Sequence, residues 1–161
     1  MTLLPLMTWL EHRPFSIAIA ESTWLFPIVE TTHVLALTVV VGSVAMMDLR
    51  LLGVGSRGRP ASEVIASSLP WAWSAFVVAF TAGSLMFSSK AATYYVNVPF
   101  RIKMICLGLA ALNMLFFHLF TARGISRWDN GPPPRAARLA AACSLTLWII
   151  IVATGRWIGF T

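Results

Sequence analysis

The chain has 161 residues, of which 58% are hydrophobic and 11% are charged. Soluble domains carry roughly 45–50% apolar and about 25% charged residues, so this composition excludes an ordinary soluble domain and favours a polytopic membrane protein. The formal net charge of +6 does not indicate nucleic-acid binding, because the basic residues flank apolar runs. The positive-inside effect accounts for basic residues at the ends of membrane-spanning segments.

The N-terminal segment, residues 3–20, does not reach spanning length without a charge. Glu11, His12 and Arg13 interrupt its apolar run. We therefore expect an interfacial amphipathic segment, with its apolar side chains toward lipid and these three residues toward water. Pro14 is expected to break the segment into two pieces.

Four apolar runs follow, each long enough to cross the ~30 Å hydrocarbon core of a bilayer. Lipid offers no hydrogen-bond partners to the backbone, so each run must be a helix. The sequence thus predicts an all-α fold, an integral membrane four-helix bundle in one domain, residues 1–161, with the interfacial segment at its N-terminus. The runs cover residues 24–47, 69–88, 101–122 and 137–158.

Basic residues predict the orientation of these helices. The connections 48–68 and 123–136 lie on one side, which holds Arg50, Arg57, Arg59, Arg123, Arg127, Arg135 and Arg138. The other side holds Arg13, Lys90, Arg101, Lys103 and Arg156. The bias places the first side in the cytoplasm and both termini in the periplasm of a bacterial inner membrane. Asp48 and Arg50 are expected to form an interfacial pair at the cytoplasmic end of the first run.

Glu30 and His33 lie inside the first run, in the stretch FPIVETTHVLALTVVVG. Ionisable groups within membrane spans are costly and indicate function. A neutral imidazole in a helical bundle is a suitable axial ligand for haem iron, and bundles build cofactor sites from inward-facing side chains. We therefore predict that His33 ligates haem b. Lys103, near the outer start of the third run, is expected to form the opposing wall of the same site.

The third run carries further candidates at helical spacing, with Asn113 at middle depth and His118 nearer the cytoplasm. Arg101 and Arg156 lie near the outer face, where haem propionates require cations. The iron ligands are predicted among the histidines, His33 first and His118 second. The second axial position stays open between Lys103, His118, Met104, a residue of a partner, or no residue.

A reading without a cofactor also accounts for these residues. His33 would then hydrogen-bond a neighbouring helix, and Glu30 would pair with Lys103, because each charge alone is expensive in a low-dielectric interior. His118 would make a polar contact near the cytoplasmic surface.

Four motifs carry a resemblance that covers residues 9–160: E-x-x-H, D-L-R-L-L-G, N-x-x-F-x-x-K and G-R-W-I. Together they resemble a bacterial family of small four-helix membrane proteins known only as a domain of unknown function. The chain is also similar to HemJ-type protoporphyrinogen oxidases and, more distantly, to CopD-like copper-resistance membrane proteins. The HemJ resemblance implies haem b with His33 as a ligand, Lys103 as a haem or substrate contact, and His118 in the place of a further histidine.

The favoured function is a b-type haem membrane protein that transfers electrons between membrane quinones and a periplasmic or membrane redox protein. Whether the chain is an enzyme is open. The alternatives are a HemJ-like protoporphyrinogen oxidase, or a non-catalytic membrane subunit or small-solute or copper carrier with a buried Glu-His-Lys cluster. The lipid bilayer is an expected partner, nucleic acid is not, and the sequence is compatible with a homo-oligomer.

Overall fold

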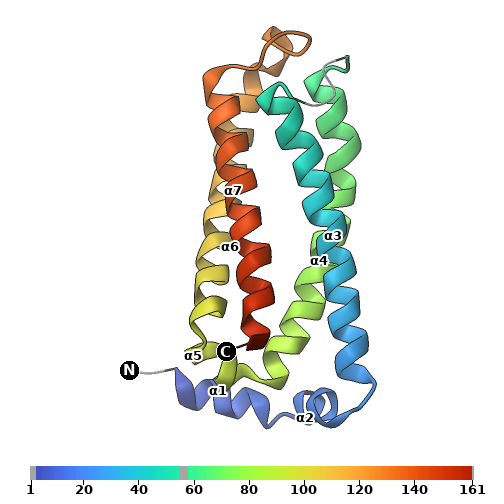
Figure 1. Ribbon diagram of the computed structural model, residues 1–161, viewed down its shortest axis with the longest axis vertical. Helices are drawn as coiled ribbons and strands as arrows, with labels where there is room; N and C mark the ends of the chain where they lie inside the picture. The colour runs from blue at the N-terminus through green and yellow to red at the C-terminus, as the bar shows by residue number, and fades with distance from the viewer. Residues whose placement is uncertain (1–2, 55–57, 161) are drawn as a thin grey trace.

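The computed structural model describes residues 3–54 and 58–160, so Arg57, one of the arginines used to predict orientation, lies outside the described residues. Within these ranges the chain is helical and contains no strand. Four long helices run side by side along the long axis (Figure 1). They are α3 (Leu25–Leu52), α4 (Ala61–Ser89), α6 (Val98–Phe116) and α7 (Arg135–Trp157). The predicted all-α four-helix bundle is confirmed.

The four long helices are also apolar enough to cross a membrane. Their spans are Leu25–Leu52, Ala61–Ser89, Val98–Arg127 and Arg135–Phe160, with mean hydropathies from 1.5 to 2.0. The third span includes the π-helical turn η1 (Phe117–Thr121) and the 3-10 helix η2 (Ala122–Arg127), and the fourth ends in η3 (Ile158–Phe160). Large apolar side chains such as Leu35, Phe80 and Ile149 face outward, as lipid-facing side chains do. The chain is a multi-pass membrane protein.

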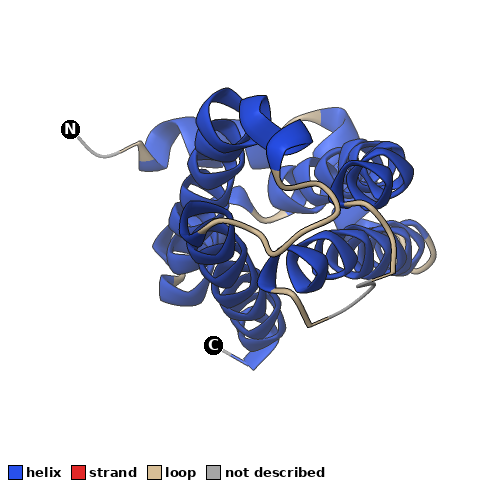
Figure 2. Cartoon of the chain, turned by 90° about the horizontal axis from the view of Figure 1, so that it is seen from above, coloured by secondary structure: helices blue, strands red, loops and turns tan. Residues whose placement is uncertain are grey.

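The bundle consists of two helix pairs, α3 with α4 and α6 with α7, and α3 also packs against α7. Figure 2 shows the helices of the bundle seen from one end. Helix α4 buries a stripe of alanines at helical spacing, Ala72, Ala75, Ala79 and Ala82. Without a hydrophobic force between helices in lipid, such small side chains allow the close backbone approach on which packing depends.

Two short helices, α1 (Leu4–Glu11) and α2 (Pro14–Glu21), lie across the end of the bundle where α3 begins (Figure 1). The break that the sequence predicts at Pro14 is confirmed, since α2 begins there. A third short helix, α5 (Ala91–Val96), connects α4 to α6. The Glu11 carboxylate accepts a hydrogen bond from the Ala92 N–H at 2.9 Å, which fastens α1 to this connection.

The predicted Asp48–Arg50 pair is wrong. Arg50 is buried, and its guanidinium donates to the Arg59 carbonyl at 2.8 Å and to the Asp129 carbonyl at 3.0 Å. Asp48 instead hydrogen-bonds Ser144 on α7. Residues two positions apart on a helix do not face each other, so the two side chains leave α3 in different directions.

Helix α4 begins at Ala61, not at residue 69, and Pro70 lies in its interior. Asp129, from the connection before α7, caps this earlier start. Its carboxylate accepts from the Ser62 N–H at 2.7 Å and from the Ser62 hydroxyl at 2.6 Å. The hydroxyl bond first, and then the backbone bond, hold the pKa of Asp129 below its usual range. This tertiary cap satisfies donors that a helix terminus otherwise leaves free.

Candidate functional site

His33 is half-buried on α3 and is held by a neighbouring helix. Its Nδ1 lies 2.7 Å from the Ala79 carbonyl oxygen of α4. A carbonyl only accepts, so Nδ1 carries the hydrogen, and in the neutral ring Nε2 keeps its lone pair. Metal-ligating histidines are commonly oriented by this kind of bond from the other ring nitrogen. The arrangement therefore leaves His33 able to bind a metal through Nε2.

Gly83, one turn beyond Ala79 on α4, makes room for this ring. A Cβ at position 83 would lie 2.9 Å from Cε1 and 3.2 Å from Nδ1 of His33. Real Cβ atoms essentially never approach a neighbour within 3.0 Å, so the imidazole rests directly on the α4 backbone. Gly83 was not among the site residues expected from the sequence. The available signal was a glycine inside a predicted helix, where glycine is otherwise costly.

Lys103 of α6 lies on the facing helix pair. It is half-buried, and its Nζ would be 3.4 Å from a Cβ placed at Gly155 of α7. Electrostatic interactions link His33 with Lys103 and with Glu30. The structure thus brings together the three residues that the sequence grouped, from α3 and α6.

Glu30 and Lys103 do not form the ion pair that is expected if the site holds no cofactor. In residues 3–54 and 58–160, the ion pair within 4.0 Å joins Arg59 and Glu63. Glu30 is exposed on α3. Its carboxylate acts on Tyr94 of α5, whose pKa is raised first by burial and then by this negative charge.

Cations and aromatic rings gather where α5 joins α4 to α6. Tyr94 stacks on Phe87 and on Phe100, with ring centroids 6.3 Å and 5.4 Å apart. Near the start of α6, Arg101 is exposed. Arg156, also exposed, has its guanidinium 5.1 Å from the ring of Phe160 near the C-terminus. Both predicted propionate contacts are therefore accessible, and neither forms an ion pair with a carboxylate of the described residues.

Asn113 lies farther along α6, and His118 lies in η1, which continues this helix. At 1.5 Å per residue they are roughly 15 and 22 Å beyond Lys103. The Asn113 amide donates to the Ala140 carbonyl of α7 at 2.9 Å. The exposed His118 ring is 3.0 Å from the Met114 carbonyl of its own helix. The structure does not bring these two residues to His33. It uses Asn113 to join α6 to α7.

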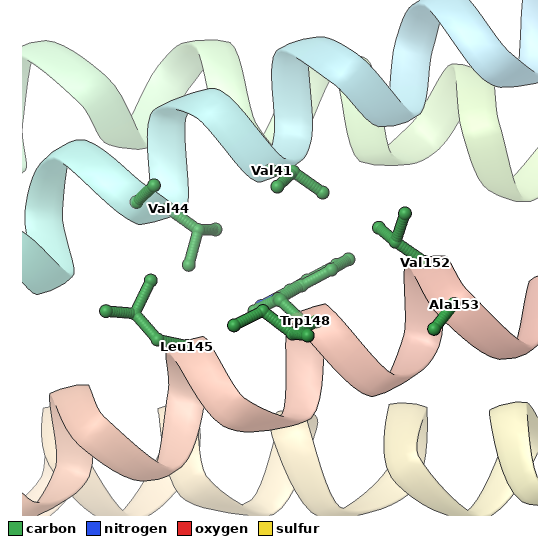
Figure 3. Close-up of a pocket in the computed structure, with 8 residues that line it drawn as sticks. Val41, Val44, Leu145, Trp148, Val152 and Ala153 are labelled. Carbon is green, nitrogen blue, oxygen red and sulfur yellow. The ribbon is translucent and has the colours of Figure 1, made fainter.

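An open apolar groove of about 360 Å³ runs between α3 and α7. Figure 3 shows Trp148 projecting from α7 toward Val41 of α3, with Leu145 and Val152 on either side of it. The lining is almost entirely hydrocarbon, and His33 is not part of it. The groove is therefore separate from the candidate site at His33.

No group of three or more His, Cys, Asp or Glu side chains that could hold a metal ion occurs in the described part of the chain. Iron within a porphyrin takes its axial ligands singly or in pairs. The donor that the geometry favours is Nε2 of His33.

Residues 24–161 match a family of unknown function, DUF6644. The chain belongs to this family. The match contains α3 to α7, and with them His33, Gly83, Lys103 and Gly155, whereas α1 and α2 precede it. No curated protein and no solved structure matches this DUF6644 chain.

Proposed function

We propose that the chain is a b-type haem membrane protein in which Nε2 of His33 is an axial ligand of the iron. The observation that carries the proposal is the 2.7 Å bond between Nδ1 and the Ala79 carbonyl. This bond selects the tautomer whose free nitrogen is Nε2, and it restrains rotation of the ring. Pre-orientation of this kind lowers the entropy lost when a ligand is bound.

The surroundings of His33 support haem over a bare metal ion. Gly83 leaves room for the His33 ring, and Gly155 leaves room for the Lys103 side chain, so both side chains can lie against the helix that faces them. Arg101 is available for propionates, which bind guanidinium groups through charge-assisted hydrogen bonds. Lys103 would contact the haem, either at a propionate or as the second axial ligand.

In this proposal His33 would hold the haem, which would supply electron transfer between membrane quinones and a periplasmic or membrane redox protein. The distribution of arginines favours a bacterial inner membrane with both termini in the periplasm. His33 lies eight residues after the start of α3, roughly 12 Å along the helix. With this orientation, a group held by His33 would lie within the outer half of the bilayer, on the side of a periplasmic partner.

A second candidate function rests on the same hydrogen bond. His33 is already bonded to Ala79, and both Glu30 and Lys103 interact with it electrostatically. This polar cluster would serve a non-catalytic subunit, or a carrier of a small solute or copper, without haem.

Absorption spectra of the purified protein distinguish the two functions. After expression with ample haem supply, we expect a Soret band that shifts on reduction with dithionite and is lost in His33→Ala. The matched control is His12→Ala, because His12 is an exposed histidine that bonds the Thr8 carbonyl within the N-terminal segment. Colourless wild-type protein, or a haem content unchanged in His33→Ala, would sink the haem proposal.

Further variants address the second ligand and folding. A band position altered by Lys103→Ala but not by His118→Ala would assign Lys103 to the iron, and the reverse would assign His118. Should His33→Ala fail to fold, His33→Gly with added imidazole supplies the ligand from solution. Recovery of the Soret band would then identify position 33 as the ligand position.

A further inference from the structure

Asp48 is a buried carboxyl group for which neither the haem site nor the end contacts of the bundle account. It lies on α3 with 6% of its surface exposed. The Ser144 hydroxyl of α7 hydrogen-bonds it. Its Oδ2 is fully buried and has no hydrogen-bond partner in the part of the chain that the structure describes. Buried polar atoms without partners are rare in native proteins, and each requires an explanation.

Among residues 3–54 and 58–160, no cation forms an ion pair with this carboxyl group. Arg50, two positions along α3, directs its guanidinium to the Arg59 and Asp129 carbonyls. The elements packed against α3 are α2, α4 and α7. Their charged side chains are all exposed, and none interacts electrostatically with Asp48: Glu21 on α2, Glu63 on α4, and Arg135, Arg138 and Arg156 on α7.

An ionised Asp48 would therefore be a lone charge within a membrane span. A carboxylate has about four acceptor sites, and here one hydroxyl contacts it. Burial of an isolated charge is far more costly than burial of a neutral polar group. Protonation of Oδ2 removes the negative charge of Asp48. It also converts Oδ2 from an acceptor that receives no hydrogen bond into an O–H group.

We propose that Asp48, supported by Ser144, is a proton-binding site of the bundle. The neutral acid carries its proton on Oδ2 and exchanges it with water at the end where α3 terminates, by COO⁻ + H₃O⁺ → COOH + H₂O. Asp48 is four residues before Leu52, the last residue of α3, or about 6 Å along the axis. A proton that moves between Asp48 and water at this end must therefore travel the length of about one helical turn. The site is separate from His33 and does not depend on the haem proposal.

Isotope-edited infrared spectroscopy tests the proposal on the full chain in liposomes. The chain contains two aspartates, Asp48 and Asp129, so aspartate labelled with ¹³C at the side-chain carboxyl reports on two groups. At neutral pH we expect one carbonyl band of a protonated acid that shifts with the label. It should be absent in Asp48→Asn and present in the control Asp129→Asn. Absence of a label-shifted acid band in the wild type, or its survival in Asp48→Asn, would overturn the proposal.

Two further measurements test the hydrogen bond and the exchange. Ser144→Ala should move the acid band to higher wavenumber without removing it. The control is Ser67→Ala, which should leave the band in place, because the Ser67 hydroxyl donates to the Val64 carbonyl of its own helix. Raising the pH should convert the acid band reversibly to carboxylate bands. A band that stays unchanged in strong alkali would show a sealed acid and refute exchange with water. If Asp48→Asn does not fold, the Asp129→Asn protein still allows the test, because Asp48 is then the one labelled aspartate in the chain.

Discussion

At the scale of single residues, the candidate site depends on a glycine as much as on a histidine. The His33 ring occupies the space that a side chain at position 83 would need. In this place the ring can donate from Nδ1 to the Ala79 carbonyl. A hydrogen bond from a side chain to a helix carbonyl of another segment is specific because it sets both the distance and the orientation of the ring.

Gly83→Ala should therefore displace the His33 ring and break its bond to Ala79. The Cβ would lie 2.9 Å from Cε1, and overpacking of this kind typically costs about 1–3 kcal/mol. We expect a lower thermal midpoint in detergent and, if haem is bound, a changed or lost Soret band.

Gly42→Ala is the matched control within α3, because a Cβ there meets nothing within 4 Å. Replacing a helical glycine by alanine removes backbone entropy from the unfolded state, so this variant should be neutral or more stable by about 0.5–1 kcal/mol. Equal behaviour of the two variants would mean that His33 does not rest on α4.

At the scale of the elements, the two ends of the bundle are held by different chemistry. One end is closed by α1, α2 and α5, and the aromatic stack of Phe87, Tyr94 and Phe100 joins α4, α5 and α6 there. The other end is tied by Arg50, which joins the end of α3 to the segments before α4 and α7. A buried guanidinium suits this role, because its fixed planar set of donors can bond two carbonyls at once.

Arg50→Gln should loosen that end. It removes two charge-assisted hydrogen bonds and leaves the Arg59 and Asp129 carbonyls without this donor, so we expect a loss of about 2–3 kcal/mol in the free energy of unfolding. Thermal unfolding followed by circular dichroism in detergent measures it. Glu63→Gln is the comparison, because it breaks an exposed ion pair with Arg59 that is worth less than about 1 kcal/mol. A loss in Arg50→Gln as small as in Glu63→Gln would contradict the role of Arg50.

At the scale of the whole molecule, the bundle places its two ionisable sites at different depths. His33 and Lys103 lie in the half that contains α5, whereas Asp48 lies one turn from the opposite end of α3. With the orientation proposed from the arginines, the first site belongs to the periplasmic half and the second to the cytoplasmic half. The direction of insertion therefore decides which compartment each site serves.

Cysteine labelling tests this orientation. In a variant without Cys106 and Cys143, an impermeant maleimide should label Thr23→Cys in intact spheroplasts. It should label Asn130→Cys only after the membrane is opened. Both positions are exposed, and they lie at opposite ends of the bundle. The reverse pattern would contradict the proposed orientation and exchange the compartments of the two sites.

Composition and hydropathy by themselves determined the four membrane helices, since lipid leaves the backbone no alternative to a helix. They also singled out Glu30, His33 and Lys103, because ionisable groups are conspicuous within apolar runs. Haem at His33 stays a prediction. Only the tertiary structure decided that His33 bonds Ala79, forty-six positions away, that Asp48 faces Ser144 instead of Arg50, and that Asp129 starts α4 at Ala61. The physical reason is that membrane helices are apolar on their lipid-facing and protein-facing sides alike. Periodicity therefore indicates a helix without showing how it is rotated, and rotation determines which side chains meet.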